Sequence, residues 1–120
     1  MALHVVADFY GVKPDILKRV EDLKPKIDEI INRSGLKSIK DVWHQFEPHG
    51  VSCVYLLRES HVSLHTWPED GYVAIDLYYC GKEQKRALDA YEMLYELFKP
   101  SKVIKNVITR PVPSEDGSPN

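Results

Sequence analysis

The chain of 120 residues lacks long hydrophobic runs and has only two cysteines. Its longest stretch without Asp, Glu, Lys or Arg spans residues 48–57, whereas a helix that crosses a membrane needs about 20 apolar residues. Residues 1–11 carry no cationic segment ahead of an apolar one, so we expect no signal peptide and no association with a membrane. Cys53 and Cys80 cannot build a disulfide framework, and we therefore expect a reduced, cytoplasmic protein.

Several familiar kinds of active site are missing as well. No two of the six glycines are close enough to form a phosphate-binding loop, and no C-x-x-C pair is present to hold zinc or exchange disulfides. The G-x-S-x-G turn of the α/β hydrolases is also absent. Lys and Arg number 16 against 18 Asp and Glu, a net charge of −2, which argues against binding to nucleic acid through a basic face.

Hydrophobic periodicity and turn residues predict the secondary structure. Pro14 suits the first turn of a helix and Gly35 suits a left-handed cap at its end. Pro25 interrupts the apolar stripe between them, so we expect a kink there or two short helices. Pro100 ends a second helix, whose apolar face is predicted from residues 87, 88, 91, 94, 95 and 98. Helices are expected over residues 14–34 and 83–98, and strands over residues 3–10, 38–46, 51–57, 61–67, 72–80 and 102–109.

The predicted order is β-α-β-β-β-β-α-β, with turns short enough to imply antiparallel neighbours. It favours an α+β two-layer sandwich, with one mainly antiparallel sheet and two helices on one face. The length fits a single domain over residues 1–110, followed by a proline-containing tail, residues 111–120, that we expect to be disordered. Nothing in the chain covers the other face of the sheet, so that face is either polar or meets a second copy. We expect a symmetric homodimer.

The densest polar cluster is the run R-E-S-H-V-S-L-H-T-W-P-E at residues 58–69. In a strand the side chains at 61, 63, 65 and 67 share one face. His61 and His65 would then lie roughly 13 Å apart, too far to share an ion, so we expect no metal site. Ser60, His65 and Asp76 are the residue types of a hydrolase triad, but most chains of this size contain them and no oxyanion loop accompanies them.

This run is part of a longer pattern. Its segments are HVVADFY at residues 4–10, F-x-P-x-G-V-S at 46–52, ESHVSLHTWPE at 59–69, AID at 74–76 and CG at 80–81. Together they resemble the prokaryotic S-adenosylmethionine decarboxylase proenzymes over roughly residues 3–110. The resemblance implies self-cleavage between Glu59 and Ser60 into chains 1–59 and 60–120, with the serine converted to a pyruvoyl group. It also implies pyruvoyl-dependent decarboxylation of S-adenosylmethionine, which yields the aminopropyl donor for spermidine, without a metal or pyridoxal phosphate.

The chemistry accounts for these residue types. Decarboxylation of an α-amino acid needs an electron sink, which no standard side chain offers and a pyruvoyl ketone supplies through a Schiff base with the substrate amine. To make that ketone, the Ser60 hydroxyl must attack the Glu59 carbonyl, and hydroxyls are poor nucleophiles unless they are held and assisted. Elimination of the resulting ester then requires a base near the Ser60 α-hydrogen.

The resemblance also implies roles for further residues. His65 would be the processing base, and Ser52 a second processing residue that holds the cyclic intermediate. Cys80 would be the proton donor in decarboxylation, since an ordinary thiol with a pKa near 8.5 is mostly protonated at neutral pH. Phe46 would stack on the adenine and attract the sulfonium cation, and Glu69 would accept hydrogen bonds from the ribose.

The sequence leaves several alternatives open. Each of these residues alone has an ordinary structural role, as a buried thiol, a turn residue or a core side chain. Trp43 and Trp67 are taken as structural, and Cys53 is expected to be inert.

The function also has alternatives. The pyruvoyl machinery acts on the amine and carboxylate of any amino acid, so a related arginine or ornithine decarboxylase is an alternative, although Phe46 favours a substrate that carries a nucleoside. A non-catalytic binding module would be marked by loss of Ser60. Active sites of the family lie at the subunit boundary, and the sequence leaves open whether one copy supplies all the residues.

Overall fold

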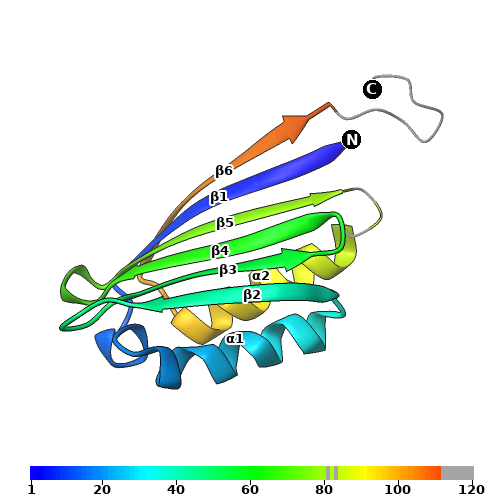
Figure 1. Ribbon diagram of the computed structural model, residues 1–120. Coiled ribbons are helices and arrows are strands. Elements are labelled where there is room, and N and C mark those ends of the chain that lie inside the picture. The colour runs from blue at the N-terminus through cyan, green and yellow to red at the C-terminus, as the bar shows by residue number, and fades with distance from the viewer. Residues whose placement is uncertain (81, 83, 112–120) are drawn as a thin grey trace.

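The protein is a sheet covered on one face by helices, as a computed structural model describes it over residues 1–80, 82 and 84–111 (Figure 1). In that part of the chain six antiparallel strands follow the order β2-β3-β4-β5-β1-β6, and α1 and α2 lie on the same face. The strands are β1 (Ala2–Tyr10), β2 (Ser38–Gln45), β3 (Val51–Leu57), β4 (Ser60–Trp67), β5 (Tyr72–Cys80) and β6 (Lys102–Arg110). The helical segments are η1 (Pro14–Leu17), α1 (Val20–Ser34), η2 (Pro68–Asp70) and α2 (Gln84–Phe98), of which η1 and η2 are short 3-10 turns. The predicted α+β sandwich and its element order are confirmed.

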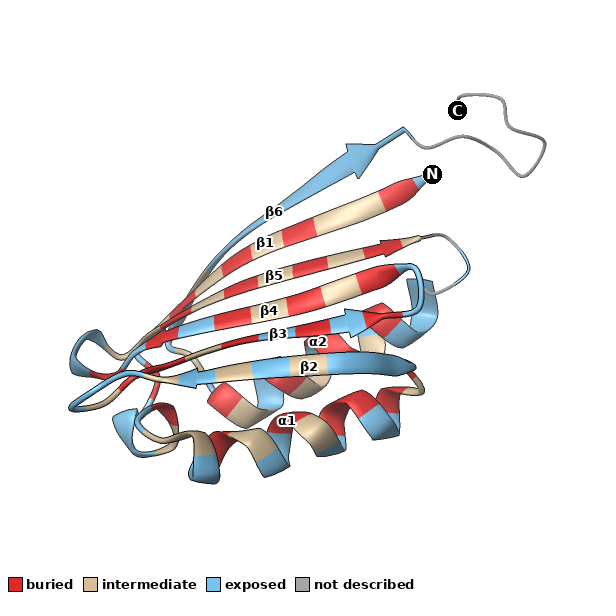
Figure 2. Ribbon diagram, viewed as in Figure 1, coloured by how far each residue is buried: buried red, intermediate tan, exposed pale blue. Residues whose placement is uncertain are grey.

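Alternation along the strands separates the two faces of the sheet, as the banding in Figure 2 shows. On β5 the side chains of Val73, Ile75 and Leu77 are at most 1% exposed, and the residues between them are half-buried. These side chains share one hydrophobic core with Leu23 of α1 and Leu94 of α2. Burying one aliphatic side chain is worth roughly 1.5–3 kcal/mol, so the core determines which face of each strand meets the helices.

The first helical region differs from the prediction at Pro25. The chain breaks before α1, at Arg19, whose backbone is extended, and Pro25 lies inside an unbroken α1. Gln45 of β2 stabilises the start of α1 after this break, because its side-chain Oε1 accepts a hydrogen bond from the Val20 N–H at 2.7 Å. Pro25 removes one hydrogen bond near the start of α1, from the carbonyl of the exposed Glu21, where solvent can replace it. At the other end Gly35, with φ 85°, is the predicted left-handed cap.

The apolar face of α2 is narrower than predicted. Leu88 and Tyr95 are 45% and 41% exposed, while Ala90, which was not on the predicted face, is buried. Each residue advances about 100° around a helix, so the buried arc centres on Ala87, Tyr91, Leu94 and Phe98 and leaves positions 88 and 95 at its border.

The sheet face opposite the helices, here called the open face, carries the alternate side chains of all the strands. Its middle is polar, with Ser63 and Asp76 as register partners on β4 and β5. Its margins carry exposed apolar side chains: Val42, Val54 and Leu56 on β2 and β3, and Ile104 and Ile108 on β6. No element of the described residues covers this face.

Two further predictions concern a disordered tail at the C-terminus and the absence of a helix that spans a membrane. The tail predicted to be disordered falls, apart from Pro111, on residues 112–120, which lie outside the described residues. Among the residues that the structure does describe, no helix is long and apolar enough to span a bilayer.

Candidate active site

The Glu59–Ser60 bond lies in the tight turn between β3 and β4. Leu57 and Ser60 are register partners, so Arg58 and Glu59 alone form the loop. Ser60 is 5% exposed, and its buried Oγ has no hydrogen-bond partner among the described residues. The Glu59 carbonyl accepts a hydrogen bond from the Sγ of Cys80 at 3.4 Å. Three predicted site residues therefore meet at this end of the sheet: Glu59 and Ser60 of the expected scissile bond, and the thiol Cys80.

A second cluster occupies the opposite end of the same strands. Ser52 of β3 and His65 of β4 are register partners on the open face, with Ser52 Oγ and His65 Nδ1 2.7 Å apart. They line a pocket of about 490 Å³ together with Phe46 and Glu69. The structure thus brings the predicted base, the second processing residue and both predicted substrate-binding residues into one pocket.

Backbone geometry at the strand ends builds this pocket. Gly50, with φ 115°, turns the chain between β2 and β3, and its carbonyl accepts a hydrogen bond from the Phe46 N–H at 2.8 Å. The Thr66 hydroxyl accepts from the Val51 N–H at 2.9 Å and donates to the Leu17 carbonyl at 2.7 Å, which ties the pocket to η1. On the other side, η2 holds Glu69 just beyond the end of β4.

The two clusters lie far apart within one copy of the chain. Ser60 and His65 are five residues apart on β4, which corresponds to roughly 17 Å along an extended strand. A general base must lie within about 3 Å of the proton that it takes, or reach it through one water. A single copy therefore does not bring His65 to the Glu59–Ser60 bond.

Comparison with known proteins decides the family. A family model described as S-adenosylmethionine decarboxylase matches residues 3–111. The chain belongs to the S-adenosylmethionine decarboxylase family. It is 42% identical over 110 residues to the S-adenosylmethionine decarboxylase proenzyme of Persephonella marina, covering 92% of this chain and 82% of the relative. It is 37% identical over 107 residues to the proenzyme of Archaeoglobus fulgidus, covering 89% and 95%.

A solved structure of the same family confirms the fold. The crystal structure of the adenosylmethionine decarboxylase from Aquifex aeolicus VF5 matches with a TM-score of 0.88 and 36% sequence identity, covering 96% of this chain and 94% of that one. A match over nearly the whole of both chains shows that the two proteins share this fold.

Two residues that the sequence did not mark as part of the site also lie at this pocket. Trp67, taken as structural, is 41% exposed and lines the pocket, with its ring 6.3 Å from that of His65. The signal was available, because the alternation that places His65 on the open face places Trp67 there as well. His49 follows Pro48 in the turn after β2, and its Nε2 lies 3.1 Å from the Glu69 carboxylate.

Two further groups near the clusters have altered pKa values. Burial raises the pKa of the Cys53 thiol to about 12, so this 2%-exposed side chain stays protonated and fits the expected inert role. Burial and the neighbouring His4 lower the pKa of His61, whose ring stacks on Tyr78 with centroids 5.5 Å apart. The residue next to Ser60 is therefore a neutral ring at pH 7.

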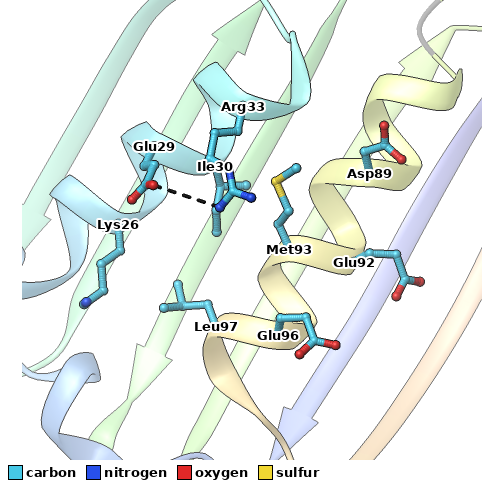
Figure 3. A pocket seen from close by; sticks show the side chains of 9 residues that line it. All are labelled: Lys26, Glu29, Ile30, Arg33, Asp89, Glu92, Met93, Glu96 and Leu97. Atoms are coloured by element: carbon cyan, nitrogen blue, oxygen red, sulfur yellow. Dashed lines mark ion pairs between the residues drawn. The ribbon is translucent and has the colours of Figure 1, made fainter.

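Another hollow, of about 470 Å³, lies between α1 and α2 (Figure 3). Ile30, Met93 and Leu97 contribute its apolar side chains, and Arg33 and Glu29 of α1 form an ion pair of 4.0 Å at its border. None of the predicted site residues lines this groove. It lies between the two helices and is separate from both clusters of predicted site residues.

Proposed function

We propose that this protein is a proenzyme that cleaves itself at Glu59–Ser60 and then decarboxylates S-adenosylmethionine, giving the aminopropyl donor for spermidine. One observation carries the proposal. The Ser60 hydroxyl is buried without a partner among the described residues, directly after a carbonyl that Cys80 contacts. Burying an unpaired hydroxyl is unfavourable, which is expected where a hydroxyl is kept free for chemistry.

Maturation needs no external oxidant or metal. The Ser60 Oγ adds to the Glu59 carbonyl carbon, the peptide C–N bond breaks, and the hydroxyl proton ends on the freed amine, leaving an ester. Loss of the Ser60 α-proton to a base then expels Glu59 as a carboxylate and leaves a dehydroalanine. That residue tautomerises to an imine, which takes up one water and releases one ammonia to leave the ketone. The Cys80 thiol supports the first step by donating to the carbonyl oxygen on which charge develops.

The resulting pyruvoyl group supplies an electron sink for decarboxylation of an α-amino acid. The chain's own side chains do the rest. Cys80, on the open face beside residue 60, delivers a proton to the substrate carbon after carbon dioxide leaves. Phe46 and Trp67 offer aromatic faces to the adenine and the sulfonium cation. Glu69, held by His49, accepts hydrogen bonds from the ribose hydroxyls.

The active site is built from two copies of the chain. His65 and Ser52 are too far from Ser60 of their own copy, so the open faces of two copies must stack about a two-fold axis. That axis places the Ser60 end of one sheet over the His65 end of the other, and by symmetry creates two equivalent sites. The exposed Val54 and Leu56 on this face support the pairing, because stacking removes them from water. In this role His65 donates its Nδ1–H to Ser52 Oγ, which leaves Nε2 unprotonated and able to take the proton.

Mixing two inactive variants tests the proposal. Ser60→Ala and His65→Ala chains should each remain uncut alone. When they are refolded together, a dimer of one of each contains one intact site, so the His65→Ala chain should be cut while the Ser60→Ala chain stays whole. Intact mass spectrometry distinguishes the products, and the downstream chain should be lighter by one ammonia than a chain that begins with serine. Mixtures without any cleavage would overturn the shared site, and a serine terminus would indicate ordinary proteolysis.

Substrate assays separate the remaining alternative. The relatives reported above are named S-adenosylmethionine decarboxylase proenzymes, and no observation favours arginine or ornithine. The two aromatic rings of the pocket fit a nucleoside, which neither amino acid carries. The cut protein should release carbon dioxide from S-adenosylmethionine, and release from arginine or ornithine alone would replace the proposal.

A further inference from the structure

The residue before the expected cleavage point has an unusual backbone conformation. Glu59 has a φ of 67°, in the left-handed region where the Cβ of an L-residue is crowded by its own backbone. It is the second residue of the loop that joins β3 and β4, and a positive φ at that position is normally supplied by glycine or asparagine. Elsewhere in the described chain the left-handed turns mostly use glycine, as at Gly35, Gly50 and Gly71.

The surrounding structure holds Glu59 in this conformation from both sides. Leu57 pairs with Ser60, and the adjacent pairs, Leu56 with His61 and Tyr55 with Val62, continue the ladder without a bulge. Leu57 and Ser60 are 1% and 5% exposed, so neither flank can shift without disturbing the core. A strained backbone conformation persists only where packed neighbours hold it in place in this way, and such conformations are concentrated at functional sites.

We propose that the left-handed conformation of Glu59 is strain built into the cleavage site, which is released as the peptide bond breaks and thereby accelerates self-cleavage. The inference rests on the proposed function, in which the Glu59–Ser60 bond is the bond that breaks. Glu59 acts here as a positioning residue through its backbone, and its carboxylate has no part in the effect.

The geometry of the acyl shift explains the release. In the peptide, the Glu59 carbonyl carbon is joined to Ser60 Cα through the amide nitrogen alone. In the ester it is joined through Oγ and Cβ, which lengthens the loop by one atom and frees it from the tight turn. Strain present in the peptide and relieved on the way to the ester lowers the barrier to the shift.

Three variants at one position separate backbone strain from side-chain chemistry. Glu59→Gln removes the carboxylate but keeps the Cβ, and Glu59→Gly removes both and relieves the left-handed strain. Cleavage should be slower in the Gly variant than in the Gln variant by about 5- to 30-fold, which corresponds to the ~1–2 kcal/mol of a left-handed residue. Glu59→Asn should fall between them, because asparagine tolerates this region better than glutamine. The rate is followed by intact mass after synthesis in a cell-free system.

A second measurement tests whether the conformation of Glu59 lowers the stability of the folded chain. In a Ser60→Ala background, which cannot be cut, Glu59→Gly should raise the urea midpoint of unfolding above that of Glu59→Gln. A Gly variant that is cut as fast as the Gln variant overturns the inference while leaving the proposed function intact, and so does a Gly variant that is no more stable. If the wild-type chain itself stays whole, the proposed function fails and the inference fails with it.

Discussion

Trp67 leaves 41% of its surface exposed beside Ser52, His65 and Glu69, where a substrate ring can stack on it. Stacking of a base on an aromatic side chain is worth about 1–3 kcal/mol. Trp67→Ala should therefore raise the KM for S-adenosylmethionine by about tenfold with a smaller change in kcat, and Trp67→Phe should retain most of the affinity. Steady-state decarboxylation by fully cut enzyme checks this. A loss confined to kcat would show that the indole acts on the chemical step.

The two cysteines owe their different character to burial. Cys53 and Cys80 are both free thiols, yet Cys53 lies in the core with a pKa raised to about 12 while Cys80 lies on the open face against the Glu59 carbonyl. Their positions on opposite faces of the sheet, on β3 and β5, thus separate a buried thiol from one that contacts the expected scissile bond.

At the scale of elements, α1 is fastened to the sheet by a polar network. The Tyr55 hydroxyl of β3 donates to Asp28 of α1, and Lys24 pairs with Asp28 at 2.8 Å and with Asp41 of β2 at 3.6 Å. Burial alone would raise the pKa of Asp28, but the hydrogen bonds from Lys24 and Tyr55 outweigh it, and the pKa is lowered. Asp28 therefore stabilises the fold most when it is ionised.

Asp28→Asn should lower the free energy of unfolding at pH 7 by roughly 1 kcal/mol, a small value because the side chain is partly exposed and screened. Since the folded-state pKa lies below the unfolded one, the stabilisation is present above the unfolded pKa of about 3.8 and disappears as the pH falls through the folded value. Urea unfolding of both proteins between pH 7 and pH 2 measures this. A difference that grows on acidification would contradict the ion-pair explanation.

For the whole molecule, the proposed function requires the open faces of two copies to meet. Val54→Asp places a charge among the exposed apolar side chains at the margin of the open face, so the variant should be monomeric at micromolar concentration and remain uncut. Leu88→Asp on α2 is the matched control, because Leu88 and Val54 are both 45% exposed but Leu88 lies on the helical side. Light scattering and intact mass report the two outcomes. A dimeric, cleaved Val54→Asp protein would place the interface elsewhere.

The sequence by itself determined what depends on neighbours along the chain. Alternation and turn residues predicted the six strands and α2 to within a few residues, and the run from Glu59 to Glu69 predicted the family. It also placed His65 on an open face. The predictions that failed involve distant partners: the break before α1 depends on Gln45 of β2, and the exposure of Leu88 depends on how α2 packs.

The tertiary structure alone decided how the predicted site residues are distributed. The hairpin of β3 and β4 turns the chain back at Arg58 and Glu59, so Ser52 meets His65 at one end and Ser60 is carried to the other. Residues of one short motif are thereby separated by the length of a strand. The physical reason is that an extended chain advances about 3.3 Å with each residue, so residues a few positions apart on one strand lie far apart in space. Pairing across strands instead brings together residues that are distant in the sequence, such as Ser52 and His65.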